Sequence, residues 1–156
     1  MKDAPYKAGP HFPALLQLLR TSETLWNSSR IFFAQWDLSP SQFNILNLLI
    51  TQPDGLSQNE LSRSLLTHRS NVTGLVDRLE ARKLIVRKDT PGDRRAYRVV
   101  LTPAGRRLVE KILPHFHEIA EQIWGEFPAT EADRLANALS QLAANAEALA
   151  AKIQNK

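Results

Sequence analysis

Two short helical patterns and a pair of β-prone runs, all between Ser57 and Arg107, constrain the fold of this chain more than any other feature. The first pattern opens at Ser57-Gln58-Asn59-Glu60, which has the spacing of a capping box at a helix start. After a turn near residues 66–68, the second pattern repeats apolar residues at the i, i+3, i+4 and i+7 positions of a helix: Val72, Leu75, Val76 and Leu79. These spacings predict two consecutive helices joined by a tight turn.

The β-prone runs predict a hairpin directly after the second helix. They cover residues 84–89 and 96–101, and Thr90-Pro91-Gly92-Asp93 lies between them. Proline at the second position and glycine at the third suit a type II turn, because glycine supplies the positive φ that this turn needs. The hairpin is therefore expected to form a wing beside the helix pair.

Long apolar helices are predicted on both sides of this stretch. Residues 11–36 have mostly helical spacing and would form a helix about 38 Å long, which exceeds what the core of so small a domain requires. A further helix follows Thr102-Pro103, with Pro114 expected to kink it, and an Ala- and Leu-rich helix follows Pro128. Because these segments carry broad apolar surfaces, we expect them to pack on a second subunit.

Together these patterns predict a mainly α fold with a small β-wing: a winged helix-turn-helix flanked by long N- and C-terminal dimerisation helices. The expected parts are an N-terminal arm and dimerisation helix at 1–37, the winged lobe at 38–104 and the C-terminal dimerisation helices at 105–156. With 156 residues, the chain is expected to form one compact domain overall.

The composition excludes several classes of protein. The chain has no cysteine, which excludes disulfides and thiolate metal sites and permits a reducing cytoplasm, where we expect the protein to act. It has no apolar run of 18 residues and no signal-peptide pattern at its start, so no membrane partner is expected. Without a glycine-rich phosphate loop, a nucleophile elbow or a spaced carboxylate pair, no enzyme is expected.

The histidines do not form a ligand set. His115 and His117 are two residues apart on a predicted helix, so their side chains would point about 200° apart. Neither a metal nor a cofactor is therefore expected.

The charge of the chain is unevenly distributed. Residues 63–107 hold 12 of the 20 Lys and Arg residues but only 4 of the 16 Asp and Glu residues, a local balance of +8, and the remainder has a balance of −4. This segregation suggests a surface that faces a polyanion. A solvated basic face without a partner would have the same composition.

The second helix carries side chains that suit the major groove of B-DNA. Guanidinium, hydroxyl and amide groups can pair with the donors and acceptors on base edges, and the N-terminal half of such a helix enters the groove in helix-turn-helix proteins. Four residues of this kind stand at the start of the helix: Arg69, Ser70, Asn71 and Thr73. We expect them to read sequence in double-stranded DNA.

Two further groups of residues are expected to hold the duplex. Cations beyond the reading residues suit the phosphate backbone: Arg78, Arg82, Lys83, Arg87 and Lys88. At the tip of the wing, Arg94 and Arg95 can enter a flanking minor groove. Asp93 would close the turn and hold an arginine by a charge-assisted hydrogen bond.

These residues resemble the core of the MarR (multiple antibiotic resistance regulator) family of winged-helix transcription factors. The resemblance covers about residues 38–110 and lies in Ser70-Asn71-Val72-Thr73 with Leu79-Glu80, in Asp93-Arg94-Arg95, and in Leu101-Thr102-Pro103-Ala104-Gly105. It implies a triangular homodimer, joined through the first and last two helices, that binds one half-site of a pseudo-palindromic operator with each wing and reading helix. It also implies repression of nearby genes, often relieved by a small anionic or phenolic ligand.

One departure from the family pattern carries a structural expectation. The family usually has glycine at the helix exit where this chain has Lys83. A non-glycine residue is therefore expected to adopt a left-handed φ at that position.

Two alternatives stay open. A winged helix can also serve as a protein-interaction module without specific DNA contacts. For an effector, Arg20, Trp26, Arg30 and Phe33 could line a cleft that accepts a small aromatic or anionic molecule. The plainer interpretation of these four residues, which we favour, is that they are core aromatics and surface arginines.

Overall fold

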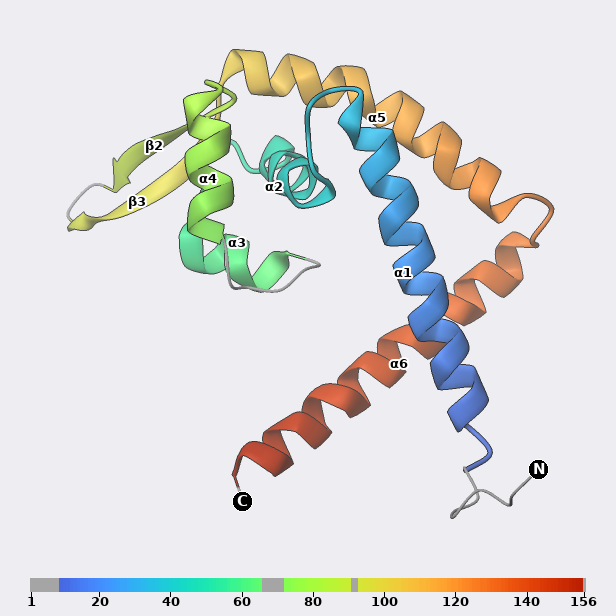
Figure 1. Cartoon of the computed structure of the whole chain (residues 1–156). Helices are drawn as coiled ribbons and strands as arrows, with labels where there is room; N and C mark the ends of the chain where they lie inside the picture. Colours follow the sequence, from blue (N-terminus) through green and yellow to red (C-terminus); the bar gives the residue numbers. More distant parts are fainter. Residues whose placement is uncertain (1–8, 66–71, 91–92, 156) are drawn as a thin grey trace. The chain divides into compact units, whose positions relative to one another are not determined.

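Six helices and three strands make up the described part of the chain (Figure 1). The computed structural model describes residues 9–65, 72–90 and 93–155, and for residues 90 and 93–96 it describes the backbone alone. The elements are α1 (Phe12–Ala34), α2 (Pro40–Ile50), β1 (Leu56–Ser57), α3 (Gln58–Ser64), α4 (Val72–Ala81), β2 (Ile85–Thr90), β3 (Asp93–Leu101), α5 (Pro103–Trp124) and α6 (Ala129–Gln154). The predicted mainly helical fold with a small β-wing is confirmed.

The chain divides into two compact units, Met1–Ile112 and Leu113–Lys156. The first unit holds α1 to α4, the three strands and the beginning of α5, and the second holds the rest of α5 and α6. The expected boundaries at residues 37 and 104 stay a prediction. None of the described helices is both long enough and apolar enough to cross a membrane.

Helix α2 is the core of the first unit. It contacts α1, α3, α4 and β3, and its residues Phe43, Ile45, Leu46 and Leu49 are at most 1% exposed. Each such side chain contributes about 1.5–3 kcal/mol by leaving water. Phe33 of α1 stacks on Phe43 with ring centroids 4.3 Å apart, which joins the end of α1 to this core.

Capping boxes start α2 and α3, and the one at α3 is the box that the sequence predicted. Ser39 and Gln42 form a full capping box at α2, and Ser57 and Glu60 form a second one at α3. The Ser57 backbone N–H donates to Glu60 at 2.7 Å and, with the Ser57 hydroxyl, lowers the pKa of the Glu60 carboxyl. Both caps satisfy backbone groups that a helix start otherwise leaves unpaired.

Helix α4 buries the apolar stripe that its spacing predicted. Val72, Val76 and Leu79 are at most 4% exposed, and Leu75 is half-buried. The helix contacts α2, α3 and β2, so its opposite face is the one turned to the surroundings.

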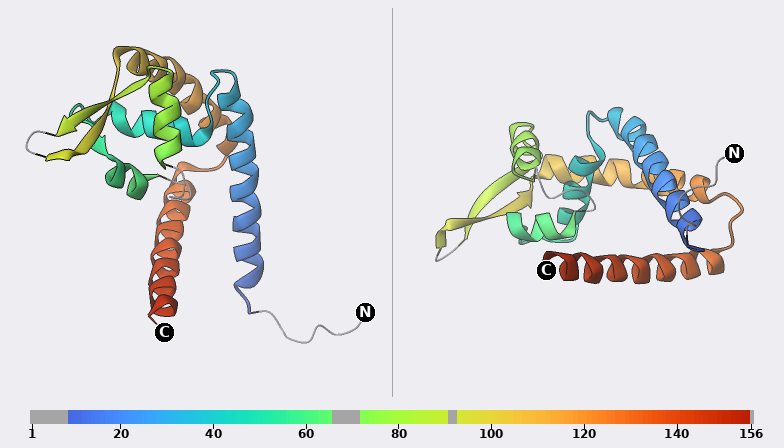
Figure 2. Two further views of the ribbon diagram at one scale, coloured as in Figure 1. Left: turned by 60° about the vertical axis from the view of Figure 1, so that its left-hand side comes forward. Right: turned by 60° about the horizontal axis from the view of Figure 1, so that its bottom comes forward.

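The wing is a three-stranded antiparallel sheet in the order β1-β3-β2. The β2–β3 hairpin projects from the helices in each view (Figure 2). Strand β1 is only two residues long and pairs Leu56 with Val99, and the sequence pattern did not predict it. Gly55 precedes β1 with φ +72°, and a Cβ there would lie 2.3 Å from the carbonyl oxygen of Val99. Glycine is therefore required for β1 to reach β3.

The start of α5 is joined to the base of the wing through the Thr102 hydroxyl and through a close approach of two backbone segments. Thr102 accepts a hydrogen bond from the Gly105 N–H at 3.0 Å, and its own hydroxyl lies 2.8 Å from the Lys83 carbonyl oxygen. Lys83 has φ +57°, which confirms the left-handed conformation expected at this helix exit. A Cβ at Gly105 would lie 2.0 Å from the carbonyl oxygen of Leu84, so α5 approaches the wing more closely than any side chain would permit.

We expect Gly105→Ala to lower the free energy of unfolding by about 1–3 kcal/mol, because the added methyl group must displace a backbone carbonyl. Thermal or urea unfolding of the purified protein measures this loss. Gly9→Ala is the matched control, since nothing lies within 4 Å of a Cβ at that position. Equal stability of the two variants would contradict the close contact between α5 and the wing.

Candidate nucleic-acid interface

The exposed face of α4 carries one described member of the predicted base-reading group. Thr73 is exposed in the first described turn of the helix. The other three members, Arg69, Ser70 and Asn71, lie outside the described residues. The wing and α4 belong to the same unit, so the described geometry relates Thr73 directly to the hairpin.

The predicted phosphate-binding cations fall into two groups in the structure. Arg78, Lys83 and Lys88 are exposed. Arg82 instead donates to the carbonyl oxygens of Trp36 and Asp37, the bond to Trp36 being 3.2 Å long. It therefore ties the end of α4 to the segment between α1 and α2.

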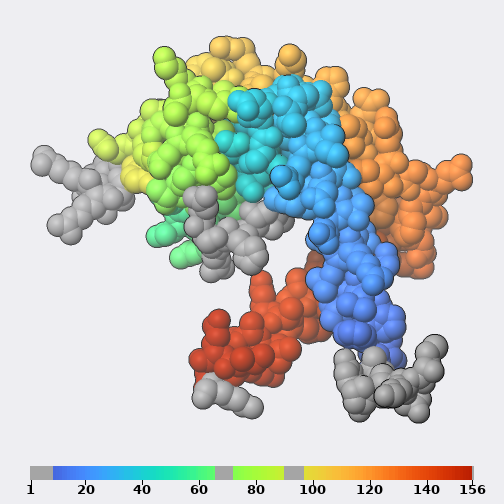
Figure 3. All heavy atoms as spheres, viewed as in Figure 1, coloured from blue at the N-terminus to red at the C-terminus, as the bar shows by residue number. Residues whose placement is uncertain are grey.

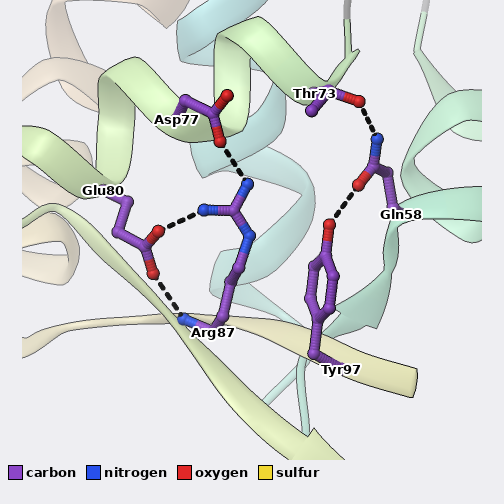
Figure 4. Close-up of polar contacts among 6 residues, drawn as sticks. All are labelled: Gln58, Thr73, Asp77, Glu80, Arg87 and Tyr97. Atoms are coloured by element: carbon purple, nitrogen blue, oxygen red, sulfur yellow. Dashed lines mark hydrogen bonds and ion pairs between the residues drawn. The ribbon is translucent and has the colours of Figure 1, made fainter. Parts of the chain in front are cut away.

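Arg87 is surrounded by partners from the protein itself (Figure 4). Its guanidinium donates to Asp77 at 2.5 Å and to Glu80, and its backbone N–H donates to the other Glu80 oxygen at 3.0 Å. The Arg87 side chain is only 23% exposed, and its Cζ lies 5.1 Å from the centre of the Tyr97 ring. Arg87 thus holds β2 to two successive turns of α4.

The electrostatics of Arg87 agree with this role. Partial burial lowers the pKa of Arg87, but hydrogen bonds to Tyr97, Asp77 and Glu80 outweigh that effect and raise the pKa above its ordinary value. The guanidinium is therefore held in its charged form, and it is shared between the carboxylates of Asp77 and Glu80.

A second polar connection runs from the wing to α4 through α3. The Tyr97 hydroxyl donates to the Gln58 side-chain oxygen, and the Gln58 amide group donates to the Thr73 hydroxyl oxygen (Figure 4). Gln58 is the first residue of α3, and Tyr97 lies on β3. Three elements of the winged lobe thus meet beside the exposed face of α4.

The predicted tip of the wing is described in its backbone. Asp93 begins β3 and pairs with Thr90, and the register shifts between Asp89 and Thr90. The side chains of Asp93, Arg94 and Arg95 lie outside the described residues. Their roles at DNA stay predictions.

Gln58 and Tyr97 are not among the residues that the sequence pattern selects. Gln58 stands inside a capping box, which explains its surroundings without a further role, and Tyr97 fits the inward face of a strand. They are 39 residues apart, so no helical or strand period relates them. Only the order of the sheet, with β3 between β1 and β2, brings them together.

The four residues proposed for an effector all lie on α1. Phe33 is 2% exposed and packs in the core, as the plainer interpretation expects. Arg20 and Arg30 are exposed and Trp26 is half-buried. Among the described residues, no group of three or more His, Asp or Glu side chains could hold a metal ion.

These elements define a winged helix-turn-helix protein: a capped α3, a second helix with an exposed polar face, and a hairpin fixed to it by Arg87. Comparison with known proteins identifies the family to which it is similar. The model of the MarR family matches residues 36–96. The chain is also 32% identical over 115 residues to the transcriptional repressor MprA of Escherichia coli (strain K12), which covers 73% of this chain and 65% of that protein.

Solved structures share the fold. A MarR/EmrR family regulator from Acinetobacter sp. ADP1 superposes with a TM-score of 0.78 at 23% identity, over 90% of this chain and 99% of that one. BpsR of Bordetella bronchiseptica, whose DNA binding is regulated by 6-hydroxynicotinic acid, superposes with a TM-score of 0.68 at 27% identity, over 81% and 98%. The chain belongs to the MarR family of winged helix-turn-helix transcriptional regulators, a family of regulators and not of enzymes. It spans just under two thirds, 65%, of the length of MprA.

We expect Arg87→Ala to lower the free energy of unfolding by about 1–2 kcal/mol, because Asp77 and Glu80 lose their shared partner in a partly solvent-screened site. Lys88→Ala removes the same charge from the next residue, which is exposed, and should change stability by less than about 0.5 kcal/mol. Urea unfolding of both variants measures the difference. Equal losses would show that the contacts of Arg87 contribute nothing beyond its charge.

Proposed function

We propose that this chain is a cytoplasmic, sequence-specific double-stranded DNA-binding repressor of transcription that acts as a homodimer on a pseudo-palindromic operator. The observation that carries the proposal is the arrangement of the winged lobe. Thr73 on α4 is exposed beside a wing that Arg87 holds in place, and Arg78, Lys83 and Lys88 are exposed and available to phosphate. The name of MprA, a transcriptional repressor, supports the direction of regulation.

Exposed apolar side chains on the terminal helices support dimerisation. No residue of α6 is buried, and leucine and isoleucine side chains along it are 37–65% exposed: Leu135, Leu139, Leu142, Leu149 and Ile153. Helix α1 likewise has exposed Leu15, Leu19 and Ile31 side chains. One side of this helix, in blue, lies open in the space-filling view (Figure 3). Apolar surfaces of this extent are typical of subunit contacts. A dimer would also supply the second reading helix that a two-fold operator needs.

A small aromatic or anionic effector is part of the proposal. The regulation of BpsR by 6-hydroxynicotinic acid supports this class of molecule. On this chain, the exposed Arg20 and Arg30 could pair with its carboxylate, and Trp26 could stack on its ring. The DNA-binding assay described below, repeated with 6-hydroxynicotinic acid, tests whether such a molecule weakens binding.

The alternative function is a protein-interaction module that makes no specific DNA contacts. The exposed cations alone would fit either function, because any acidic partner can attract them. The two functions differ in sequence preference and in the dependence of binding on salt.

We expect the full chain to shift duplex DNA from its own upstream region in preference to a scrambled duplex, with affinity falling steeply as salt rises. Arg95→Ala should weaken binding about tenfold or more by removing the wing contact. Arg134→Ala is the charge-matched control, since Arg134 lies on α6 and pairs with Glu131. No preference over scrambled DNA would refute specific binding, and an unchanged affinity for Arg95→Ala would refute the role of the wing.

Dimerisation is tested by sedimentation at micromolar protein concentration, where we expect a dimer. Leu142→Glu should shift the protein towards monomer, because it places a charge on the apolar face of α6. Gln141→Glu adds the same charge at the neighbouring exposed residue and should leave the dimer intact. A wild-type protein that sediments as a monomer would contradict the proposed assembly.

A further inference from the structure

The hydrogen bonds among Tyr97, Gln58 and Thr73 all run in one direction. Tyr97 donates to Gln58 Oε1, and Gln58 Nε2 donates to Thr73 Oγ1 (Figure 4). The three residues belong to β3, to the start of α3 and to α4. A strand of the wing is therefore connected to the exposed face of the reading helix through one side-chain amide.

The orientation of the Gln58 amide fixes this direction. Its oxygen lies toward Tyr97 and can only accept, so the Tyr97 hydroxyl is the donor of that bond. A side-chain amide whose oxygen accepts at one end must offer its NH2 group at the other.

Thr73 is the last residue in this series of hydrogen bonds. Its oxygen accepts from Gln58, so one of its two lone pairs is occupied and its proton is available to a further acceptor. Thr73 is exposed, so that partner can come from a bound molecule. In the major groove, the acceptors within reach of a donating hydroxyl are guanine N7 and O6, adenine N7 and thymine O4, whereas the cytosine amino group is a donor.

We propose that Tyr97 and Gln58 are positioning residues that present the Thr73 hydroxyl as a hydrogen-bond donor, so that Thr73 selects a base with an acceptor at one position of the operator. The proposal rests on the proposed DNA-binding function and deepens it, because it assigns part of the sequence preference to residues outside α4. With Gln58 on one of its two lone pairs, the Thr73 hydroxyl has fewer ways to accept from a base and is biased towards donating, which sharpens its distinction between bases.

A double-mutant cycle on base preference tests the proposal. The preferred duplex is selected with the wild-type protein, and the base pair at which Thr73→Val changes preference is identified. At that pair, Tyr97→Phe should lower discrimination about threefold to tenfold, the value of one hydrogen bond. It keeps the aromatic ring beside Arg87. In the Thr73→Val background, Tyr97→Phe should cause no further loss, whereas in a Thr73→Ser background its effect should persist.

Reversing the amide provides an independent measurement. In Gln58→Glu, the carboxylate can only accept, so it takes the proton of Thr73 and turns the donor inward. Discrimination at the same base pair should fall about threefold to tenfold. Asn59→Asp introduces the same charge at the adjacent exposed residue, and should weaken binding to all duplexes without changing the preference.

The outcomes distinguish a failure of the positioning role from a failure of the proposed DNA-binding function. Losses that add in the cycle, or a Tyr97→Phe variant that weakens all duplexes equally, would show a merely structural role and overturn the positioning role alone. A wild-type protein with no preference for any duplex would overturn the proposed function, and this proposal with it. Thermal unfolding of every variant confirms that the changes in preference are measured on folded protein.

Discussion

The burial of α2 is the constraint on which the rest of the winged lobe depends. Its apolar residues face α1, α3, α4 and β3 at once, and four of them are at most 1% exposed. Because a close-packed interior tolerates little displacement, the elements that share this core cannot move independently. The orientation of the reading helix and the base of the wing are therefore set by one apolar helix that itself lies inside the protein.

Polar contacts determine the direction of hydrogen bonding in the winged lobe, which apolar packing does not. Apolar packing fixes positions, but it is indifferent to which end of a hydrogen bond carries the proton. Arg87 connects β2 to α4 through Asp77 and Glu80, and the contacts of Tyr97 with Gln58 extend that connection to α3. One cation thereby anchors the hairpin to two turns of α4.

The sequence predicts the local parts of this fold and misses the distant ones. The cap at Ser57 and the apolar stripe of α4 each depend on neighbours within a few residues, so spacing alone reveals them. The left-handed Lys83 is expected from the glycine that the family usually has at this helix exit. Strand β1 is only two residues long and exists through its pairing with β3, which no local period encodes. The contacts of Arg87 are likewise hidden from the sequence, because its partners on α4 come within reach only when the hairpin folds back. Its role at the DNA backbone stays a prediction.

The contact between Gly105 and the Leu84 carbonyl couples the start of α5 rigidly to the base of the wing. Backbone meets backbone there, so no rotamer can absorb a rotation of the helix as a side-chain contact could. The part of α5 in the first unit, residues 103–112, is about 15 Å long, so a tilt of about 6° about this contact corresponds to about 1.6 Å at residue 112. Within this unit, a tilt of the helix is therefore accompanied by a rotation of the backbone at the base of the wing.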